Sequence, residues 1–358
     1  MLQKFFLNLI FMSLMTNAKA QKEPSYVFVD ASELSVSGRA AAIPQKTFHR
    51  VESKYLLDLP ARVAELATNS AGIYVSFKTD SKNISLKWTL EKYNTRWNMT
   101  SLAINGLDLY AWNGKKWQFM APARASSATN EAVLINDLDG NMRHYRLYLP
   151  LYAELKTLEI GVDSLSIIDA PDQTFLPSKK VVIYGSSITQ GASASRPGMA
   201  YPSILSRQLN IETFNMGFSG SGKMEIILAD VLASMEADIY ILDCVPNPSP
   251  AEIKERTVPF VKRLRALKPG VPIIMVESII REQSHWSEPR GKRMSEQNAE
   301  FRKAFEKLSS EKYQDLHYIP ATHLTGDDHE ATIDGTHLTD LGFTRIAEII
   351  GKTLQRLL

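Results

Sequence analysis

The sequence after Lys180 alternates between short, uninterrupted apolar runs and longer amphipathic stretches, and no other feature constrains the fold as strongly. Apolar runs of about four to eight residues are typical of strands buried on both faces, whereas the amphipathic stretches have the period of helices. Buried strands that alternate with helices form parallel βαβ units. Residues 176–358 are therefore predicted to form a doubly wound α/β domain around a parallel sheet. The predicted strands contain VVIYG, IETFNMG, DIYILDCV, VPIIMVES and LHYIP, and the predicted helices cover about Met199–Asn210, Met224–Glu236, Ala251–Leu267, Ser295–Lys307 and Leu341–Leu357.

Before Lys180 the pattern is different, because apolar and polar residues alternate between turns rich in Gly, Asn and Asp. Alternation with a period of two is typical of antiparallel strands that bury one face. Residues 21–175 are therefore predicted to form an antiparallel β-sandwich, with a short helix within Ala61–Ala71 and a linker at Pro171–Lys180. The alternating runs are GIYVSFKTD, NISLKWTLEKY, TSLAINGLDLYAW, KKWQFM, HYRLYLPLY and KTLEIGVD.

The first 20 residues have the pattern of a secretory signal peptide. MLQK supplies a positive start, FFLNLIFMSLM an apolar core, and small residues precede a cleavage site after Ala20. A membrane anchor is the weaker interpretation, because the apolar run is shorter than the roughly 18 residues that a membrane span needs. Residues 1–20 are thus predicted to be removed, which places the mature protein in the periplasm or outside the cell.

Composition excludes several classes of partner. The formal net charge is +2 and the sequence has no long basic run, so neither nucleic acid nor, after signal cleavage, a membrane surface is an expected partner. Cys244 is the single cysteine, which rules out an intrachain disulfide. It ends an apolar run and is predicted to be a small buried residue rather than a nucleophile.

Polar residues follow several predicted strands at the sheet edge where doubly wound proteins bind ligands. Ser187 follows VVIYG, the glycine-rich loop NMGFSGSG follows IETFNMG, and Asn247 follows DIYILDCV. Asp334 and His337 lie three residues apart near the C-terminus, a spacing that allows a carboxylate to orient an imidazole. A serine hydroxyl becomes a nucleophile when such a base takes its proton, so the set predicts a nucleophilic site.

Each of these candidate residues and loops also has a purely structural interpretation. Serine, glycine and asparagine are common in turns, and the segment around His337 contains candidate caps for the last helix in Thr339 and Asp340. A cap at either residue leaves His337 just outside the helix, so the two interpretations are compatible. Because such residues occur at several strand ends of one sheet, a functional site is favoured over a set of unrelated turns and caps.

These residues resemble the sequence blocks of the SGNH, or GDSL-like, hydrolases. The resemblance implies Ser187 of GSSIT as the nucleophile, with Ser186 in place of the usual aspartate, and Asp334 and His337 of DGTH as orienting residue and base. It also implies an oxyanion hole made by the backbone N–H groups of Ser187 and Gly220 and the side chain of Asn247, although CVPN replaces the usual third block. GSSITQG, SRPGMAYPSIL, DGTHLTDLGF and NGLDLY resemble the bacterial subgroup whose β-rich N-terminal domain carries a G-x-D-L-Y motif.

The resemblance implies a serine esterase that needs neither a metal nor an organic cofactor. Together with export and the β-sandwich, it predicts the removal of acetyl groups from a small or polymeric carbohydrate ester. Candidate substrate-binding residues are Trp97, in the polar run YNTRWNMT, and Arg281 and Trp286, in REQSHWSEPR. His285 of the same run is another residue that could line the cleft, and a solvated loop is the alternative interpretation of this run. The other tryptophans of the sandwich, which include Trp88, Trp112 and Trp117, are expected to lie in the core.

Two other classes of function compete with a serine esterase. A metal-dependent hydrolase would use the cluster of possible zinc or calcium ligands within residues 323–337, although the cluster lacks a regular metal-binding spacing. A carbohydrate-binding protein that lost its chemistry is favoured only by the atypical Ser186 and CVPN. The members of the metal cluster are His323, Asp327, Asp328, His329, Asp334 and His337.

Overall fold

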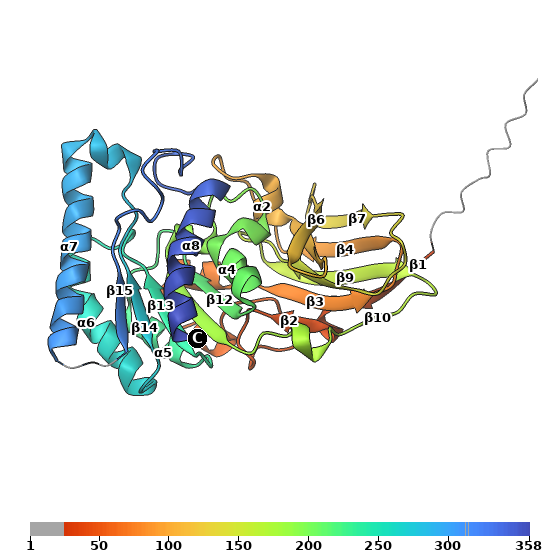
Figure 1. Ribbon diagram of the computed structural model, residues 1–358, viewed down its shortest axis with the longest axis horizontal. Coiled ribbons are helices and arrows are strands. Elements are labelled where there is room, and N and C mark those ends of the chain that lie inside the picture. Colours follow the sequence, from red (N-terminus) through yellow and green to blue (C-terminus); the bar gives the residue numbers. More distant parts are fainter. Residues whose placement is uncertain (1–24, 312, 314) are drawn as a thin grey trace, which may run out of the picture.

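The computed structural model describes residues 25–311, 313 and 315–358. A β-rich part and an α/β part lie next to each other along the long axis of the molecule (Figure 1). The predicted signal peptide, residues 1–20, lies outside the described residues. No helix within the described ranges combines the length and the apolar character that crossing a bilayer requires.

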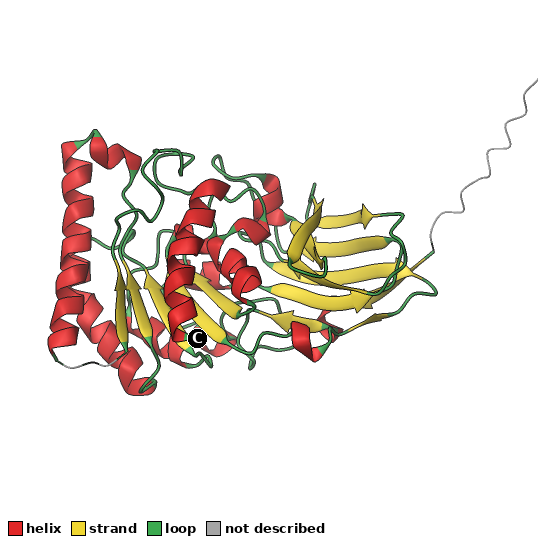
Figure 2. Cartoon of the chain, viewed as in Figure 1, coloured by secondary structure: helices red, strands yellow, loops and turns green. Residues whose placement is uncertain are grey.

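The β-rich part consists of two antiparallel sheets that enclose one hydrophobic core, as predicted (Figure 2). Alternating residues of the strands, such as Val75 and Phe77, point into this core, which Trp88 also fills. The first sheet has the order β1 (Tyr26–Asp30), β9 (Leu155–Asp163), β4 (Ile84–Leu90) and β7 (Thr129–Ile135). The second has the order β10 (Ile168–Asp169), β3 (Tyr74–Thr79), β8 (Arg143–Tyr148), β5 (Leu107–Trp112) and β6 (Trp117–Ala123), with β2 (Ser35–Ser37) paired to β3. Two short helices belong to this half of the sequence, α1 (Ala61–Ala67) and α2 (Ser101–Asn105).

The C-terminal sheet is parallel and has the order β12–β11–β13–β14–β15, which confirms the predicted doubly wound α/β domain behind a β-sandwich. Because β11 is first in sequence but lies between β12 and β13, the strand order reverses beside it, and the carboxyl ends of β11 and β13 open the ligand crevice typical of such sheets. The strands are β11 (Lys180–Gly185), β12 (Glu212–Gly217), β13 (Ile239–Asp243), β14 (Ile273–Val276) and β15 (Leu316–Ile319). The helices are α3 (Ser187–Gln190), α4 (Tyr201–Leu209), α5 (Ile226–Ala233), α6 (Pro250–Leu267), α7 (Glu288–Ser310) and α8 (Asp340–Leu357).

Helices cover both faces of this sheet. Successive side chains of β11 point to opposite faces, so Val181 packs with α4 and α8 while Val182 packs with α5, α6 and α7. Cys244, at the end of β13, is fully buried in the second of these clusters, as predicted. The start of α7 differs from the prediction of about Ser295, because its first two turns are almost wholly polar and show no helical period; Pro289 near its start suits the first turn of a helix.

A stretch of the N-terminal half completes the core of the C-terminal part. Val51 and Val63, within residues 40–67, share a hydrophobic cluster with side chains of the parallel sheet. The Arg50 side chain is buried and donates to main-chain oxygens of Leu66, Asn69, Asn215 and Gly217. The predicted domain boundary between residues 175 and 176 stays a prediction. Around residues 40–67, the two parts share one hydrophobic core.

Asp108 of the NGLDLY motif joins the two parts at a second place. It lies on β5, its side chain is wholly buried, and it accepts hydrogen bonds from Arg196 Nη1 (2.8 Å) and from the backbone N–H of Gly198 (2.9 Å). Burial raises the pKa of Asp108, and the charge of Arg196 opposes this effect. The motif thus fixes the segment that follows α3 against the sandwich.

Replacing Asp108 with alanine is expected to lower the free energy of unfolding by about 3–5 kcal/mol, because Arg196 would stay in a mostly buried place without its partner. Denaturant unfolding measures this change. The matched control is Asp172→Ala, which removes an exposed carboxylate that contacts Lys78 and His144 in the same half of the molecule and is expected to change stability far less. Equal effects of the two substitutions would contradict a joining role for Asp108.

Candidate active site

Ser187 lies at the carboxyl end of β11, as the first residue of the short helix α3. Gly185 allows the tight turn before it, since a Cβ atom there would lie 1.9 Å from Thr189 Oγ1. The Ser186 side chain caps α3 by accepting a hydrogen bond from the N–H of Ile188 (3.2 Å). An aspartate side chain can cap a helix in the same way. Ser186 can therefore replace the aspartate usual at this position without loss of the cap.

Ser187, His337 and Asp334 form one hydrogen-bonded chain. Ser187 Oγ lies 2.9 Å from His337 Nε2, and His337 Nδ1 lies 2.7 Å from Asp334 Oδ2. Because Asp334 is an acceptor, Nδ1 carries the ring proton, which leaves Nε2 free to accept the proton of the serine hydroxyl. The structure thus brings together the three residues that the resemblance implies as nucleophile, base and orienting group.

The loop that carries Asp334 and His337 is held by its own backbone. Asp334 Oδ1 accepts hydrogen bonds from the N–H groups of Thr336 (3.0 Å) and His337 (2.8 Å), and Gly335 adopts a positive φ of 83° at the turn. Thr339 caps α8 by accepting from the N–H of Gly342, so the predicted cap is present and leaves His337 outside the helix. The imidazole is consequently positioned by the loop rather than by a helix.

Asn98, which no sequence pattern singled out, completes the surroundings of Asp334. Its side-chain amide nitrogen donates to Asp334 Oδ2 (3.1 Å) from the N-terminal half of the chain. Burial raises the pKa of Asp334, but the hydrogen bonds from His337 and Asn98 outweigh it, so the pKa is lowered below its ordinary value. The carboxylate therefore stays charged at neutral pH and can stabilise an imidazolium.

Three N–H donors near the strand ends are free to bind a negative charge. Asn247 Oδ1 accepts from the N–H of Gly222 (3.1 Å), and this contact fixes the side-chain amide while its nitrogen donates to no described group. The backbone N–H groups of Ser187 and Gly220 likewise donate to nothing within the described residues. These are the donors that the resemblance implies for an oxyanion hole.

Asp243, at the end of β13, is a buried carboxyl group close to the Ser187 turn. Its side chain accepts hydrogen bonds from Thr189 Oγ1 (2.8 Å) and the hydroxyl of Tyr201 (2.9 Å). Burial raises the pKa of Asp243 to about 7, and the two hydrogen bonds lower it only in part. No ion pair of the described residues neutralises this group.

This pKa predicts a pH dependence of stability. The folded-state pKa lies above the ordinary value, so folding binds a proton, and stability falls as the pH rises from about 4 through 7. Between pH 5 and pH 8 the wild type is expected to lose roughly 3 kcal/mol relative to Asp243→Asn, at about 1.36 kcal/mol per pKa unit. Denaturant unfolding of both proteins at the two pH values measures the difference. Parallel pH profiles would show that the Asp243 carboxyl does not hold a proton in the folded state.

The residues predicted to contact substrate lie in different surroundings. Trp97 and Trp286 are strongly exposed, at 87% and 90%. Trp88 is buried in the sandwich core, as expected, whereas Trp117 and the partly buried Trp112 belong to a separate aromatic cluster and line a cavity. Trp97 immediately precedes Asn98, whose side chain donates to Asp334. Arg281 is partly buried and donates to the main-chain oxygen of Pro246 (2.9 Å). Substrate binding by these residues stays a prediction.

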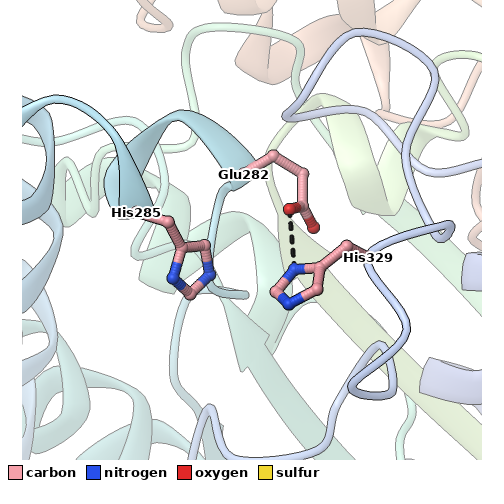
Figure 3. Close-up of side chains that lie close together, drawn as sticks. All are labelled: Glu282, His285 and His329. Atoms are coloured by element: carbon pink, nitrogen blue, oxygen red, sulfur yellow. Dashed lines mark hydrogen bonds and ion pairs between the residues drawn. The ribbon is translucent and has the colours of Figure 1, made fainter.

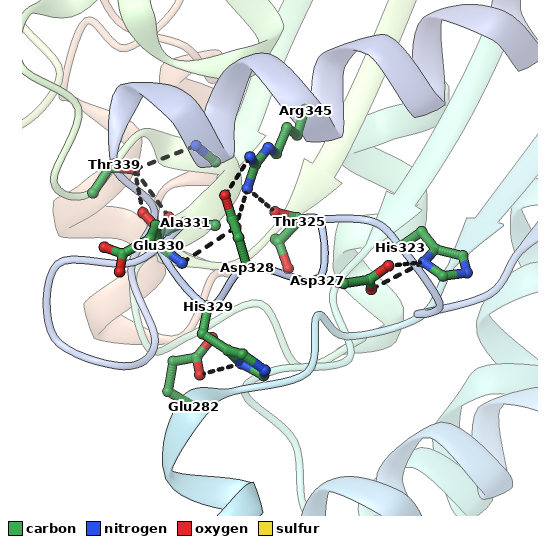
Figure 4. Close-up of polar contacts among 11 residues, drawn as sticks. Glu282, His323, Thr325, Asp327, Asp328, His329, Glu330, Ala331, Thr339 and Arg345 are labelled. Carbon is green, nitrogen blue, oxygen red and sulfur yellow. Dashed lines mark hydrogen bonds and ion pairs between the residues drawn. The ribbon is translucent and has the colours of Figure 1, made fainter.

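The possible metal ligands of residues 323–337 do not converge on one point. Figure 4 shows that His323 pairs with Asp327 and that Asp328 pairs with Arg345, on separate turns of the loop. Asp334 and His337 pair with each other instead. These side chains therefore do not form the joint ligand set that a metal-dependent hydrolase would need within residues 323–337.

One other group of possible metal ligands occurs among the described residues. Glu282, His285 and His329 have ligand atoms within 4.8 Å of one another, and His329 Nδ1 lies 2.9 Å from the Glu282 carboxylate (Figure 3). The two histidines are exposed and none of the three residues belongs to the hydrogen-bonded chain at Ser187. This group thus gives no support to metal-assisted catalysis at Ser187.

A cavity of about 840 Å³ is formed at the contact between the sandwich and the segment around α4. Aromatic side chains such as Trp112 and Phe119 and the guanidinium groups of Arg196 and Arg207 line it. None of its lining residues belongs to the chain of Ser187, His337 and Asp334, so cavity size alone does not identify the site.

Two protein-family models match the chain. Residues 26–168 match GxDLY, the N-terminus of SGNH-hydrolase-type esterases, and residues 178–355 match the GDSL-like lipase/acylhydrolase family. None of the curated proteins compared with this chain matches it.

Solved structures show the same architecture. A protein from Bacteroides ovatus described as a GDSL-like lipase is 41% identical, with a TM-score of 0.89 over 93% of this chain and 98% of that one. A salicylyl-acyltransferase from a tetracycline biosynthetic pathway is 16% identical, with a TM-score of 0.76 over 93% and 97% of the two chains. A family two carbohydrate esterase from Cellvibrio japonicus is 14% identical, with a TM-score of 0.62 over 93% and 98%, and these last two likenesses concern the fold alone. The chain belongs to the GDSL-like lipase/acylhydrolase family and carries the N-terminal domain of SGNH-type esterases.

Proposed function

We propose that the protein is an exported serine esterase that removes O-acetyl groups from a carbohydrate. The observation that carries this proposal is the hydrogen-bonded chain from Ser187 through His337 to Asp334, with unoccupied N–H donors at the neighbouring strand ends. Family membership supports ester hydrolysis, and the geometry supplies a nucleophile, a base and a place for an oxyanion.

In the proposed reaction, His337 Nε2 accepts the hydroxyl proton while Ser187 Oγ attacks the acyl carbon. The N–H groups of Ser187, Gly220 and Asn247 donate hydrogen bonds to the oxyanion that forms. His337 then gives the proton to the leaving sugar oxygen, and the acyl group stays on Ser187 as an ester. A water molecule, deprotonated by His337, attacks that ester, releases acetate and restores the serine.

Two observations support a carbohydrate substrate. The fold is shared with the carbohydrate esterase from Cellvibrio japonicus, and the exposed Trp97 and Trp286 offer ring faces on which a sugar can stack. Export rests on residues 1–20 of the sequence and agrees with a polymeric substrate outside the cytoplasm.

The experiment is a screen of acetylated, methylated and feruloylated glycans with the wild type and Ser187→Ala. We expect acetate release by the wild type from acetylated glycans and none above background by the variant. Equal release by the two proteins would overturn Ser187 as the nucleophile, and a preference for ferulate or methanol release would overturn the acetyl assignment.

A further inference from the structure

A small cavity rich in arginine lies beside the candidate active site. Its volume is about 200 Å³, and it lies between the segment after β14, the first turns of α7 and the loop that carries His337. The lining residues are Arg281, Gln283, Ser284, Arg290, Arg293 and Thr336. We refer to it as the arginine cavity.

Three contacts place the arginine cavity next to the catalytic loops. Thr336 is adjacent to His337 and donates its N–H to Asp334. The N–H of Glu282, at the start of the segment that lines the cavity, donates to the carbonyl of Gly335 (3.0 Å). On the other side, Arg281 donates to the carbonyl of Pro246, the residue before Asn247. The cavity therefore adjoins the loops of both the base and the predicted oxyanion donor.

The positive charges around this cavity have no anionic partner among the residues that the structure describes. Arg281, Arg290 and Arg293 form no ion pair with a carboxylate among the described residues. Arg281 Nε is buried and has no hydrogen-bond acceptor. Burial, and after it the charge of Arg293, lowers the pKa of Arg281, which shows that the guanidinium is partly desolvated beside a like charge. Arg290 and Arg293 are exposed, so the desolvation cost falls on the partly buried Arg281, and a bound anion would offset it.

We propose that the arginine cavity binds an anionic group, a carboxylate or a sulfate, carried by a sugar residue of the substrate. Guanidinium groups pair with planar and tetrahedral oxyanions through two parallel hydrogen bonds, and the hydroxyl of Thr336 adds a neutral donor. The inference deepens the proposed function, on which it rests: the acetylated glycan is acidic, and its charge selects it over neutral glycans of the same shape.

Binding rather than turnover tests this proposal, so its result is independent of the proposed esterase activity. Ser187→Ala protein is titrated by calorimetry with digalacturonate, with a monosulfated galactobiose and with neutral galactobiose. We expect at least one anionic disaccharide to bind about tenfold or more tightly than the neutral one, with an affinity that falls as salt is added. The comparison of the two anionic sugars shows which group the cavity prefers.

Substituting the arginines one at a time shows whether the anionic sugar binds in the arginine cavity. Arg290→Gln and Arg293→Gln, each made in the Ser187→Ala protein, are expected to weaken binding of the preferred sugar about tenfold. Lys292→Gln is the matched control, since Lys292 lies on the same turn of α7, is exposed and does not line the cavity. Equal binding of charged and neutral sugars would overturn the proposal. Equal losses for Lys292→Gln and the arginine variants would overturn it as well, because the effect would then be one of net charge.

Discussion

Replacing Ser187 with alanine is expected to reduce kcat for 4-nitrophenyl acetate by a factor of about 10⁴ or more. The substitution removes the atom that attacks the acyl carbon while His337 and Asp334 keep their hydrogen bond to each other. Because Ser187 is nearly buried and alanine is smaller, the fold is expected to persist. Steady-state kinetics and the unfolding midpoint of the same preparation measure the two effects.

The neighbouring serine provides a matched control. Ser186→Ala removes a hydroxyl from the same turn, but this hydroxyl caps α3 and does not touch His337. It is expected to lower the free energy of unfolding by about 1 kcal/mol and to leave ester hydrolysis largely in place. If Ser186→Ala lost hydrolysis while Ser187→Ala kept it, Ser186 and not Ser187 would be the nucleophile.

Replacing Asn247 with alanine is expected to lower kcat about 10²- to 10³-fold with a much smaller change in KM. The side-chain nitrogen of Asn247 donates to none of the described residues, so in the proposed reaction its hydrogen bond is made only when the oxyanion forms. An interaction that exists only in the transition state affects kcat rather than substrate binding.

Asn247→Asp separates this role from a structural one. Aspartate keeps an oxygen that can accept the Gly222 N–H, but it has no N–H to donate and would place a negative charge near the oxyanion. Its kcat is therefore expected to be at least as low as that of Asn247→Ala. A near-normal kcat in Asn247→Asp would show that Asn247 only holds the glycine-rich loop.

The fold class follows from local patterns, which explains why it was predictable. Strands such as Lys180–Gly185 are apolar on both faces, and the alternation with helices leaves few topologies. The packing of residues 40–67 on the α/β part was not predictable, because it depends on contacts between residues far apart in sequence. Arg50, which binds carbonyl groups on β12, shows no periodicity that would reveal a buried position.

The candidate site was predictable to a similar extent. Ser187 belongs to a short motif at the end of a strand, Asp334 and His337 belong to one just before the last helix, and the structure brings the three together. Asn98 could not be found in this way, since it reaches Asp334 across 236 positions of the sequence and lies in a polar loop without a motif. Arg290 and Arg293 were hidden for another reason: their charges lie on polar helical turns, and only the structure shows that they surround a cavity with Arg281.

The central claim is that Ser187 is a nucleophile activated by His337, and covalent labelling tests it most directly. Folded wild-type protein is treated with a fluorophosphonate and analysed by intact mass and peptide mapping. We predict one adduct, located on Ser187, that is absent from Ser187→Ala and forms far more slowly in His337→Ala. No adduct on the folded wild type, or an adduct at another residue, would contradict the account and favour a protein that binds carbohydrate without hydrolysing it.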